Sequence, residues 1–132
     1  MEVIRRTPDT KRGPAEWFTG DVYLDEISPG PHVKLLSVHF TPGARTAWHA
    51  HPFGQIIHVT EGAGIFQVAG EPPQPLRPGD TVRFDANEVH WHGAGPTTFM
   101  THLAMQEVAD DGSDAVWGDQ VTDAEYSPDH FA

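Results

Sequence analysis

Histidine is frequent in this sequence, and four of the histidines form two closely spaced pairs. The chain of 132 residues contains nine histidines, among them His49 with His51 and His90 with His92. Side chains two residues apart on a β-strand point to the same face, so each pair would present two imidazole rings side by side. Neutral imidazoles are good ligands for divalent transition metals. A lone pair of this kind is often a surface or core feature, so the metal interpretation depends on its surroundings.

A glutamine follows the first pair at a spacing that could bring it to the same metal ion. Gln55 lies four residues after His51, beyond a turn at 52–54. Because the chain reverses at that turn, Gln55 can lie opposite the two imidazoles. A further imidazole must come from a distant strand, and either His90 or His92 could supply it. The spacing therefore predicts a metal site built from segments far apart in the sequence.

The overall composition excludes several classes of protein and site. The formal net charge is −11 and only 8 residues are Lys or Arg, which argues against nucleic acid and anionic membrane surfaces as partners. Cysteine is absent, so disulfides, thiolate metal sites and thiol nucleophiles are excluded. The first residues lack the apolar core of a signal peptide, and no apolar run approaches the roughly 20 residues of a membrane span. We expect a cytoplasmic protein that acts on a small molecule.

Short strands must position the candidate ligands. The chain contains 13 Gly and 12 Pro, and so many turn formers favour short strands over long helices. About seven to nine strands with frequent turns predict an all-β sandwich or barrel. Residues 71–80 are expected to form a loop, and a short helix is expected to begin near Thr122. The expected strands are 21–27, 32–40, 64–70, 97–108, two short strands within 81–94, and a hairpin made by 45–51 and 55–62.

Two longer motifs contain the candidate ligands. Residues 43–62 read G-x5-H-x-H-x3-Q-x6-G, which resembles the first motif of the cupin family except that Gln55 replaces the usual Glu. Residues 79–94 resemble the second cupin motif, with Gly79 and His90 in register. The departures from this second motif are Asp85, Asn87 and Ala94, which stand where Pro, Gly and Asn are typical.

The segments GPAEWFTG, VHWHGAGPTT and MTHLAMQE extend the resemblance over residues 13–126. They look like the small cupins that include the bacterial manganese-dependent hydroxynitrile lyases. The resemblance implies a homodimer or homotetramer of a single-domain jelly-roll β-barrel. The implied parts of this domain, 1–132, are an N-terminal arm at 1–20, a barrel at about 21–108, and a short helix or tail at 109–132. The implied metal ligands are His49, His51, Gln55 and His90.

Gln55 is the most informative of these ligands. A set of three histidines and one glutamate carries one negative charge, whereas three histidines and one glutamine carry none. A divalent ion held by neutral ligands would be a stronger Lewis acid and would be harder to oxidise. This favours non-redox chemistry over oxygen activation. Imidazole-rich ligation suits manganese, iron, nickel, zinc or copper, and manganese is the metal that the resemblance implies.

Further polar residues near the ligands supply candidate catalytic groups. His92 lies two residues from a predicted ligand, and His102 and Gln106 share one face of the last long strand. The opposite arrangement, which buries Leu103 and Met105 and exposes His102, is left open by the spacing. We predict that His92 or His102 is the base and that Gln106 donates a hydrogen bond to an oxyanion or to cyanide.

The predicted function combines these groups with an apolar pocket. Leu36, Val38 and Phe40 alternate along one strand and are predicted to line the pocket for an aromatic or aliphatic substrate. The resemblance implies a metal-dependent lyase that cleaves a cyanohydrin into an aldehyde and cyanide, or adds cyanide to an aldehyde. Two alternatives are a cupin dioxygenase of small aromatic substrates and a cupin that binds a metal or small molecule without catalysis. The polar groups beyond the ligands favour catalysis.

Overall fold

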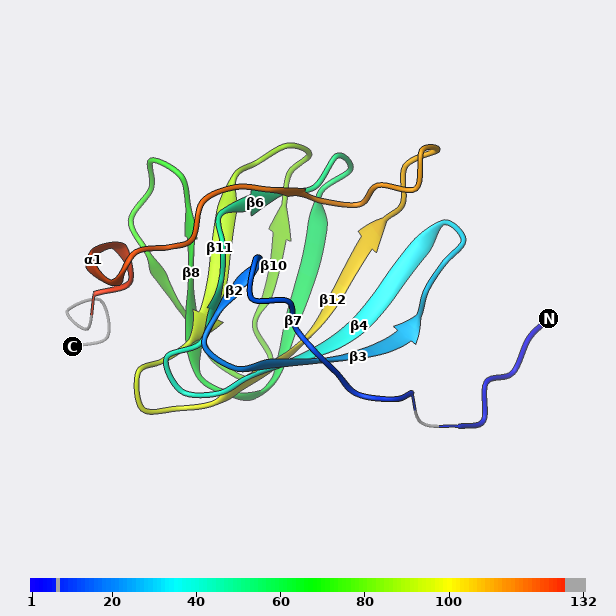
Figure 1. Cartoon of the computed structure of the whole chain (residues 1–132), viewed down its shortest axis with the longest axis horizontal. Helices are drawn as coiled ribbons and strands as arrows, with labels where there is room; N and C mark the ends of the chain where they lie inside the picture. Colours follow the sequence, from blue (N-terminus) through cyan, green and yellow to red (C-terminus); the bar gives the residue numbers. More distant parts are fainter. Residues whose placement is uncertain (7, 128–132) are drawn as a thin grey trace.

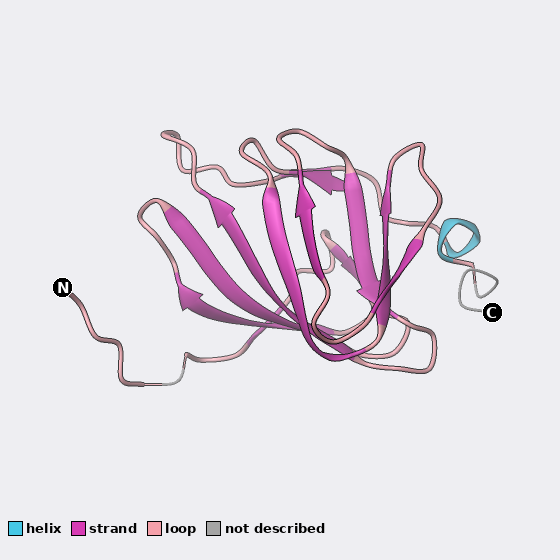
Figure 2. Ribbon diagram, turned by 180° about the vertical axis from the view of Figure 1, so that it is seen from behind, coloured by secondary structure: helices cyan, strands magenta, loops and turns pink. Residues whose placement is uncertain are grey.

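Alternation of apolar and polar residues folds this chain into two antiparallel β-sheets that curl around a shared core (Figures 1 and 2). The computed structural model describes residues 1–6 and 8–127. Its elements are β1 (Lys11–Arg12), β2 (Phe18–Thr19), β3 (Val22–Ser28), β4 (Val33–Phe40), β5 (Arg45–Thr46), β6 (His49–Ala50), β7 (Gln55–Gly62), β8 (Gly64–Val68), β9 (Gln74–Leu76), β10 (Thr81–Phe84), β11 (His90–Ala94), β12 (Met100–Glu107), β13 (Val116–Trp117) and α1 (Asp123–Tyr126).

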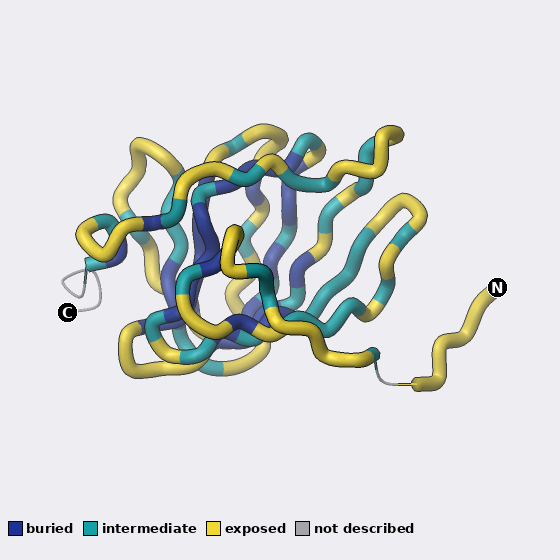
Figure 3. Tube along the Cα trace, in the orientation of Figure 1, coloured by how far each residue is buried: buried dark blue, intermediate teal, exposed yellow. Residues whose placement is uncertain are grey.

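The two sheets face each other across the core. One has the strand order β1-β3-β4-β12-β7-β10, and the other has the order β13-β6-β11-β5-β2, extended by β8 on β11 and by β9 on β8. Strand β11 is buried along its whole length, whereas exposed residues gather in loops and in the N-terminal arm (Figure 3). The predicted all-β jelly-roll barrel is confirmed, and so is the short C-terminal helix.

The segments 45–51 and 55–62 do not form the hairpin that we predicted. Strand β7 pairs with β10 and β12, while β6 pairs with β11 and β13 in the other sheet. The turn at 52–54 therefore carries the chain across the barrel. Gly54 permits this crossing, because its φ of 80° favours glycine and a Cβ there would clash with the Phe84 carbonyl oxygen. As a result, Gln55 starts from the sheet opposite His49.

Two local features also differ from the sequence expectations. Residues 71–80 contain the strand β9, which pairs with β8 at the edge of its sheet. Pro75 is tolerated there because an edge strand does not need every N–H for pairing. Asn87 adopts a φ of 62°, and asparagine enters this left-handed region more readily than most residues. The position where cupins typically carry glycine thus keeps a glycine-like turn ahead of His90.

The chain after β12 runs across the top edge of the barrel and reaches α1 (Figure 1). The helix begins after Thr122, whose side chain forms a capping box with Glu125. Of the predicted tail 109–132, residues 128–132 lie outside the described residues. In the part of the chain that the structure describes, no helix is long and apolar enough to cross a membrane.

A buried arginine holds this C-terminal segment against the barrel. Arg45 is 5% exposed, and its Nη2 donates to the Val121 carbonyl at 2.8 Å and to the Asp123 carboxylate at 2.9 Å. Its guanidinium also lies over the ring of Tyr126, 4.4 Å from the centroid. The Tyr126 hydroxyl donates to the Ala94 carbonyl at 2.6 Å. These contacts fix the path of the segment that covers the mouth of the barrel.

Candidate metal centre

Three histidines converge where β6 and β11 meet. His49 and His90 are opposite each other in the pairing of these strands, and His51 follows directly after β6. One ring nitrogen from each histidine lies within 4.8 Å of the other two, and all three residues are buried. Nitrogens this close can share one metal ion, since metal–imidazole bonds are roughly 2 Å long.

Backbone carbonyls fix which nitrogen of each ring faces the centre. The Nδ1–H of His49 donates to Ala47 at 2.9 Å, and that of His90 donates to Glu88 at 2.8 Å. The Nδ1–H of His51 donates to the carbonyl of Asp114 at 2.7 Å. A carbonyl can only accept, so the proton of each neutral ring is on Nδ1 and the lone pair is on Nε2. Outer hydrogen bonds of this kind orient histidine ligands in metal sites.

Gln55 completes the donor set from the opposite sheet. Its Oε1 lies 3.2 Å from His90 Nε2. Burial lowers the pKa of His90 to about 3, so the ring is neutral at pH 7 and both facing atoms carry only lone pairs. In the described residues the buried Nε2 of His51 has no hydrogen-bond partner either. A cation would satisfy these lone pairs together, so the residues fit a divalent metal ion.

A second pair of buried histidines lies beside the first cluster. His102 donates its Nδ1–H to the carbonyl of Leu103 at 3.2 Å, which leaves its Nε2 as an acceptor. His92 Nδ1 lies 3.0 Å from that Nε2 and therefore carries the donated proton. The remaining nitrogen, Nε2 of His92, is buried and has no partner among the described residues. Its ring centroid is 5.3 Å from that of His49.

Burial keeps this second pair neutral. It lowers the pKa of His92 well below its usual value and lowers the pKa of His102 to about 4, with further lowering at His92 from the neighbouring imidazole of His102. His92 thus donates to His102, and His102 donates to the Leu103 carbonyl. The free lone pair that remains is on His92 Nε2. That lone pair carries no proton at neutral pH.

Comparison with known proteins identifies the family. The sequence profile of the cupin domain matches residues 36–102. An (R)-mandelonitrile lyase from Granulicella tundricola is 51% identical over 130 residues, with 96% of this chain and 98% of the relative covered. The chain belongs to the cupin family. The resemblance inferred from the two motifs is confirmed.

Solved structures agree with the fold. A cupin-like protein from Thermotoga maritima superposes with a TM-score of 0.83 at 36% identity, and the match covers 95% of each chain. A polyketide cyclase from Streptomyces resistomycificus superposes with a TM-score of 0.68 at 16% identity, covering 96% of this chain and 91% of that one. The second likeness concerns the fold alone.

The cupin barrel encloses a cavity of about 230 Å³ next to the histidines. Leu36 and Val38 line it as predicted from their alternation, and the inward face of β12 contributes His102 and Ala104. Phe40 does not line this cavity. It packs in the core beneath, with its ring centroid 5.3 Å from that of His102. The prediction for Phe40 is wrong because the strand continues past the end of the cavity.

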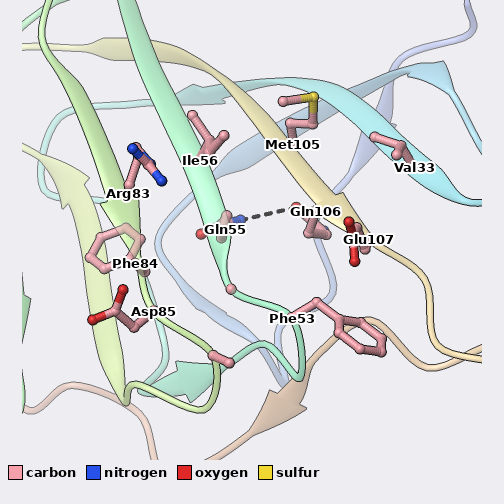
Figure 4. A pocket seen from close by; sticks show the side chains of 12 residues that line it. Val33, Phe53, Gln55, Ile56, Arg83, Phe84, Asp85, Met105, Gln106 and Glu107 are labelled. Carbon is pink, nitrogen blue, oxygen red and sulfur yellow. Dashed lines mark hydrogen bonds between the residues drawn. The ribbon is translucent and has the colours of Figure 1, made fainter.

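Gln106 lines the cavity, and its amide is bonded to other protein side chains. We expected its amide to face a substrate oxyanion or cyanide. In the structure its Oε1 accepts from Gln55 Nε2 at 3.1 Å (Figure 4). Its Nε2 donates to Asp114 Oδ2 at 2.9 Å. Met105, the next residue towards the N-terminus, is 39% exposed on the outer face. The strand therefore turns His102 and Gln106 toward the predicted ligands, and Gln106 bonds to one of them, Gln55.

Two residues of the C-terminal segment belong to this centre and were missed in the sequence. Asp114 holds His51 through its carbonyl. Trp117 stacks on His49 with ring centroids 4.6 Å apart, and Trp17 of the N-terminal arm stacks on Trp117 at 5.0 Å. No spacing signal connects 114–117 with the motifs. Only the tertiary path of the segment brings these residues to the ligands.

Proposed function

We propose that this cupin is a metal-dependent lyase that cleaves a cyanohydrin into an aldehyde and cyanide, and that adds cyanide to an aldehyde in reverse. The observation that carries the proposal is the free Nε2 of His92, which lies beside a neutral donor set and next to an apolar cavity. The relative named (R)-mandelonitrile lyase supports the same chemistry.

We propose that His49, His51, Gln55 and His90 hold the metal. When bound, a divalent ion there would supply Lewis acidity toward the substrate. Manganese is proposed from the resemblance, and iron, nickel or zinc suit the same donors. The absence of a carboxylate among these donors argues against a cupin dioxygenase, which must stabilise a higher oxidation state.

His92 is the proposed base. Its Nε2 accepts the hydroxyl proton of the cyanohydrin as the bond to cyanide breaks and the carbonyl forms. The imidazolium that results keeps its Nδ1–H bond to His102, whose ring is oriented by the Leu103 carbonyl. The proton then passes to the departing cyanide, which leaves as hydrogen cyanide. His102 acts through His92 and is a positioning residue, because both of its nitrogens are already bonded.

The cavity wall accommodates the carbon skeleton of the substrate. Leu24, Leu36, Val38 and Ala104 face the histidines across the cavity. An apolar wall opposite a few polar groups suits a small aromatic or aliphatic aldehyde.

The test of the proposal is release of benzaldehyde from mandelonitrile by the manganese-loaded protein, with and without a chelator. We expect the chelator to abolish the activity, and we expect no oxygen uptake with small aromatic substrates. His92→Ala should lower kcat about 10²- to 10⁴-fold while the metal content is retained. His58→Ala, at a half-buried histidine on the outer face of β7, is the matched control and should leave both unchanged. Benzaldehyde release no faster than background would exclude the lyase.

We also propose that the protein assembles as a homodimer or homotetramer in the cytoplasm, as in the family that it resembles. Light scattering of the metal-loaded protein measures the assembly directly. A monomer at micromolar concentration would contradict it.

A further inference from the structure

A glutamine ligand poses a problem that a glutamate does not. The two ends of the Gln55 amide have nearly the same shape, but only Oε1 can bind a cation, because the NH₂ group presents protons. Packing alone does not choose between the two orientations. Something outside the metal centre must determine which end of Gln55 faces the three histidines.

A chain of hydrogen bonds makes this choice. Gln55 Nε2 donates to Gln106 Oε1 at 3.1 Å (Figure 4), and Gln106 Nε2 donates to Asp114 Oδ2 at 2.9 Å. Asp114 Oδ1 pairs with Lys34 Nζ at 3.4 Å. An ionised carboxylate can only accept, so Gln106 must turn its NH₂ group toward Asp114 and its oxygen toward Gln55. Gln55 must then donate to that oxygen, which turns Oε1 toward the histidines.

The same aspartate also orients a second donor. The Asp114 carbonyl accepts from His51 Nδ1 at 2.7 Å and so leaves the His51 lone pair on Nε2. The Asp114 side chain is 21% exposed and that of Lys34 is 29% exposed, so solvent weakens this ion pair only in part. One residue of the C-terminal segment thus reaches two donors by two separate routes, its carbonyl and its carboxylate.

We propose that Asp114 is a positioning residue that makes the oxygen of Gln55, rather than its nitrogen, the metal ligand. It acts through Gln106, and Lys34 anchors it. The proposal rests on the metal centre proposed above. It also gives Gln106 a different role from the substrate donor expected from the sequence.

A pair of substitutions in two backgrounds tests the proposal. Asp114→Asn removes the acceptor-only end of the chain but keeps the carbonyl that holds His51. With Gln55 present, both amides can then reverse, and we expect manganese binding to weaken about 10- to 100-fold. In the Gln55→Glu background both ends of residue 55 are oxygens, so amide orientation no longer matters. Gln106 would then donate to Glu at position 55, and Asp114 would face the Gln106 oxygen, so Asp114→Asn should leave binding unchanged or tighten it.

The dissociation constant of manganese, measured by competition with a chelator, is the readout in all four proteins, and thermal unfolding reports whether each folds. Asp119→Asn removes the same charge from an exposed residue of the same segment and should leave the constant within about twofold. Equal weakening by Asp114→Asn in both backgrounds would show a simple charge effect and overturn the proposal. Wild-type binding in Asp114→Asn would overturn it as well. If the wild-type protein itself fails to bind manganese or another divalent ion, the metal centre is wrong instead.

Discussion

The site is built from histidines that are buried without charge. Burial is the main cause of the lowered pKa at each of the three candidate histidine ligands and at the second pair. Each ring has a carbonyl or another imidazole that fixes its proton on Nδ1. His102 Nε2 accepts from His92, and the other four rings keep a lone pair on Nε2. In the metal-free protein, conditions that protonate histidines disfavour the folded state, because these buried rings resist protonation.

The stability of the metal-free protein should therefore fall as the pH is lowered. Each of these histidines has a lower pKa in the folded protein than its pKa of about 6.5 in the unfolded chain. Below pH 6.5 the unfolded chain therefore binds more protons than the folded protein, and the free energy of unfolding falls as the pH is lowered. The pKa is about 3 for His90 and about 4 for His102. Each of these histidines should therefore lower the free energy of unfolding by about 2 kcal/mol between pH 7 and pH 5. Urea unfolding of chelator-treated protein measures the loss.

His102→Gln should reduce this loss by about 2 kcal/mol, because it removes one of the titrating rings. His58→Ala, at a half-buried histidine outside the site, is the control and should keep the full loss. A free energy of unfolding that stays constant from pH 7 to pH 5 would contradict the neutral buried histidines.

At the level of elements, the turn at 52–54 is decisive. It takes the chain from β6 in one sheet to β7 in the other, and so places Gln55 across the barrel from the histidines. Gly54 occupies the left-handed region at a φ of 80° and lies against the backbone of Phe84. The position of Gln55 beside the histidines therefore depends on the close contact between the backbones of Gly54 and Phe84.

Gly54→Ala should damage both the fold and the metal site. The left-handed conformation costs an alanine about 1 kcal/mol, and the clash with the Phe84 carbonyl adds to this. We expect a total loss of about 3 kcal/mol in the free energy of unfolding, together with weaker manganese binding. Gly70→Ala is the matched control, because Gly70 has a φ of 84° but no atom near its Cβ position. It should cost only about 1 kcal/mol, and equal effects of the two substitutions would rule out the backbone contact at Gly54.

In the whole molecule, the proposed metal would connect parts that the chain brings together from a distance. His49 and His90 belong to one sheet and Gln55 begins a strand of the other. The C-terminal segment closes over them, with Asp114 bonded to His51 and Trp117 stacked on His49. Binding at this place requires the assembled barrel, so the ion should bind the folded state and not the unfolded chain.

Manganese should therefore stabilise the fold. At a free concentration 100 times its dissociation constant, the gain is about 2.7 kcal/mol, which for a domain of this size is roughly 10 °C in Tm. Thermal unfolding with increasing manganese measures the shift. His90→Ala should remove the shift, whereas His58→Ala, outside the site on the outer face of β7, should retain it. An unchanged Tm in the wild-type protein at saturating manganese would contradict binding at the centre of the barrel.

Sequence patterns alone predicted most of the strands, the cupin family and a short helix that begins near Thr122. These follow from local signals, since side chains on a strand alternate and a cap is formed within four residues. Packing in three dimensions was needed to show that the chain crosses between sheets after His51, that β12 turns His102 inward, and that Phe40 lies below the cavity. The bond between Gln106 and Gln55 also appears only in the folded chain. Tertiary packing alone brought Asp114 to His51, 63 residues away. Spacing encodes which face a side chain takes, but the partner it meets there depends on how distant segments pack.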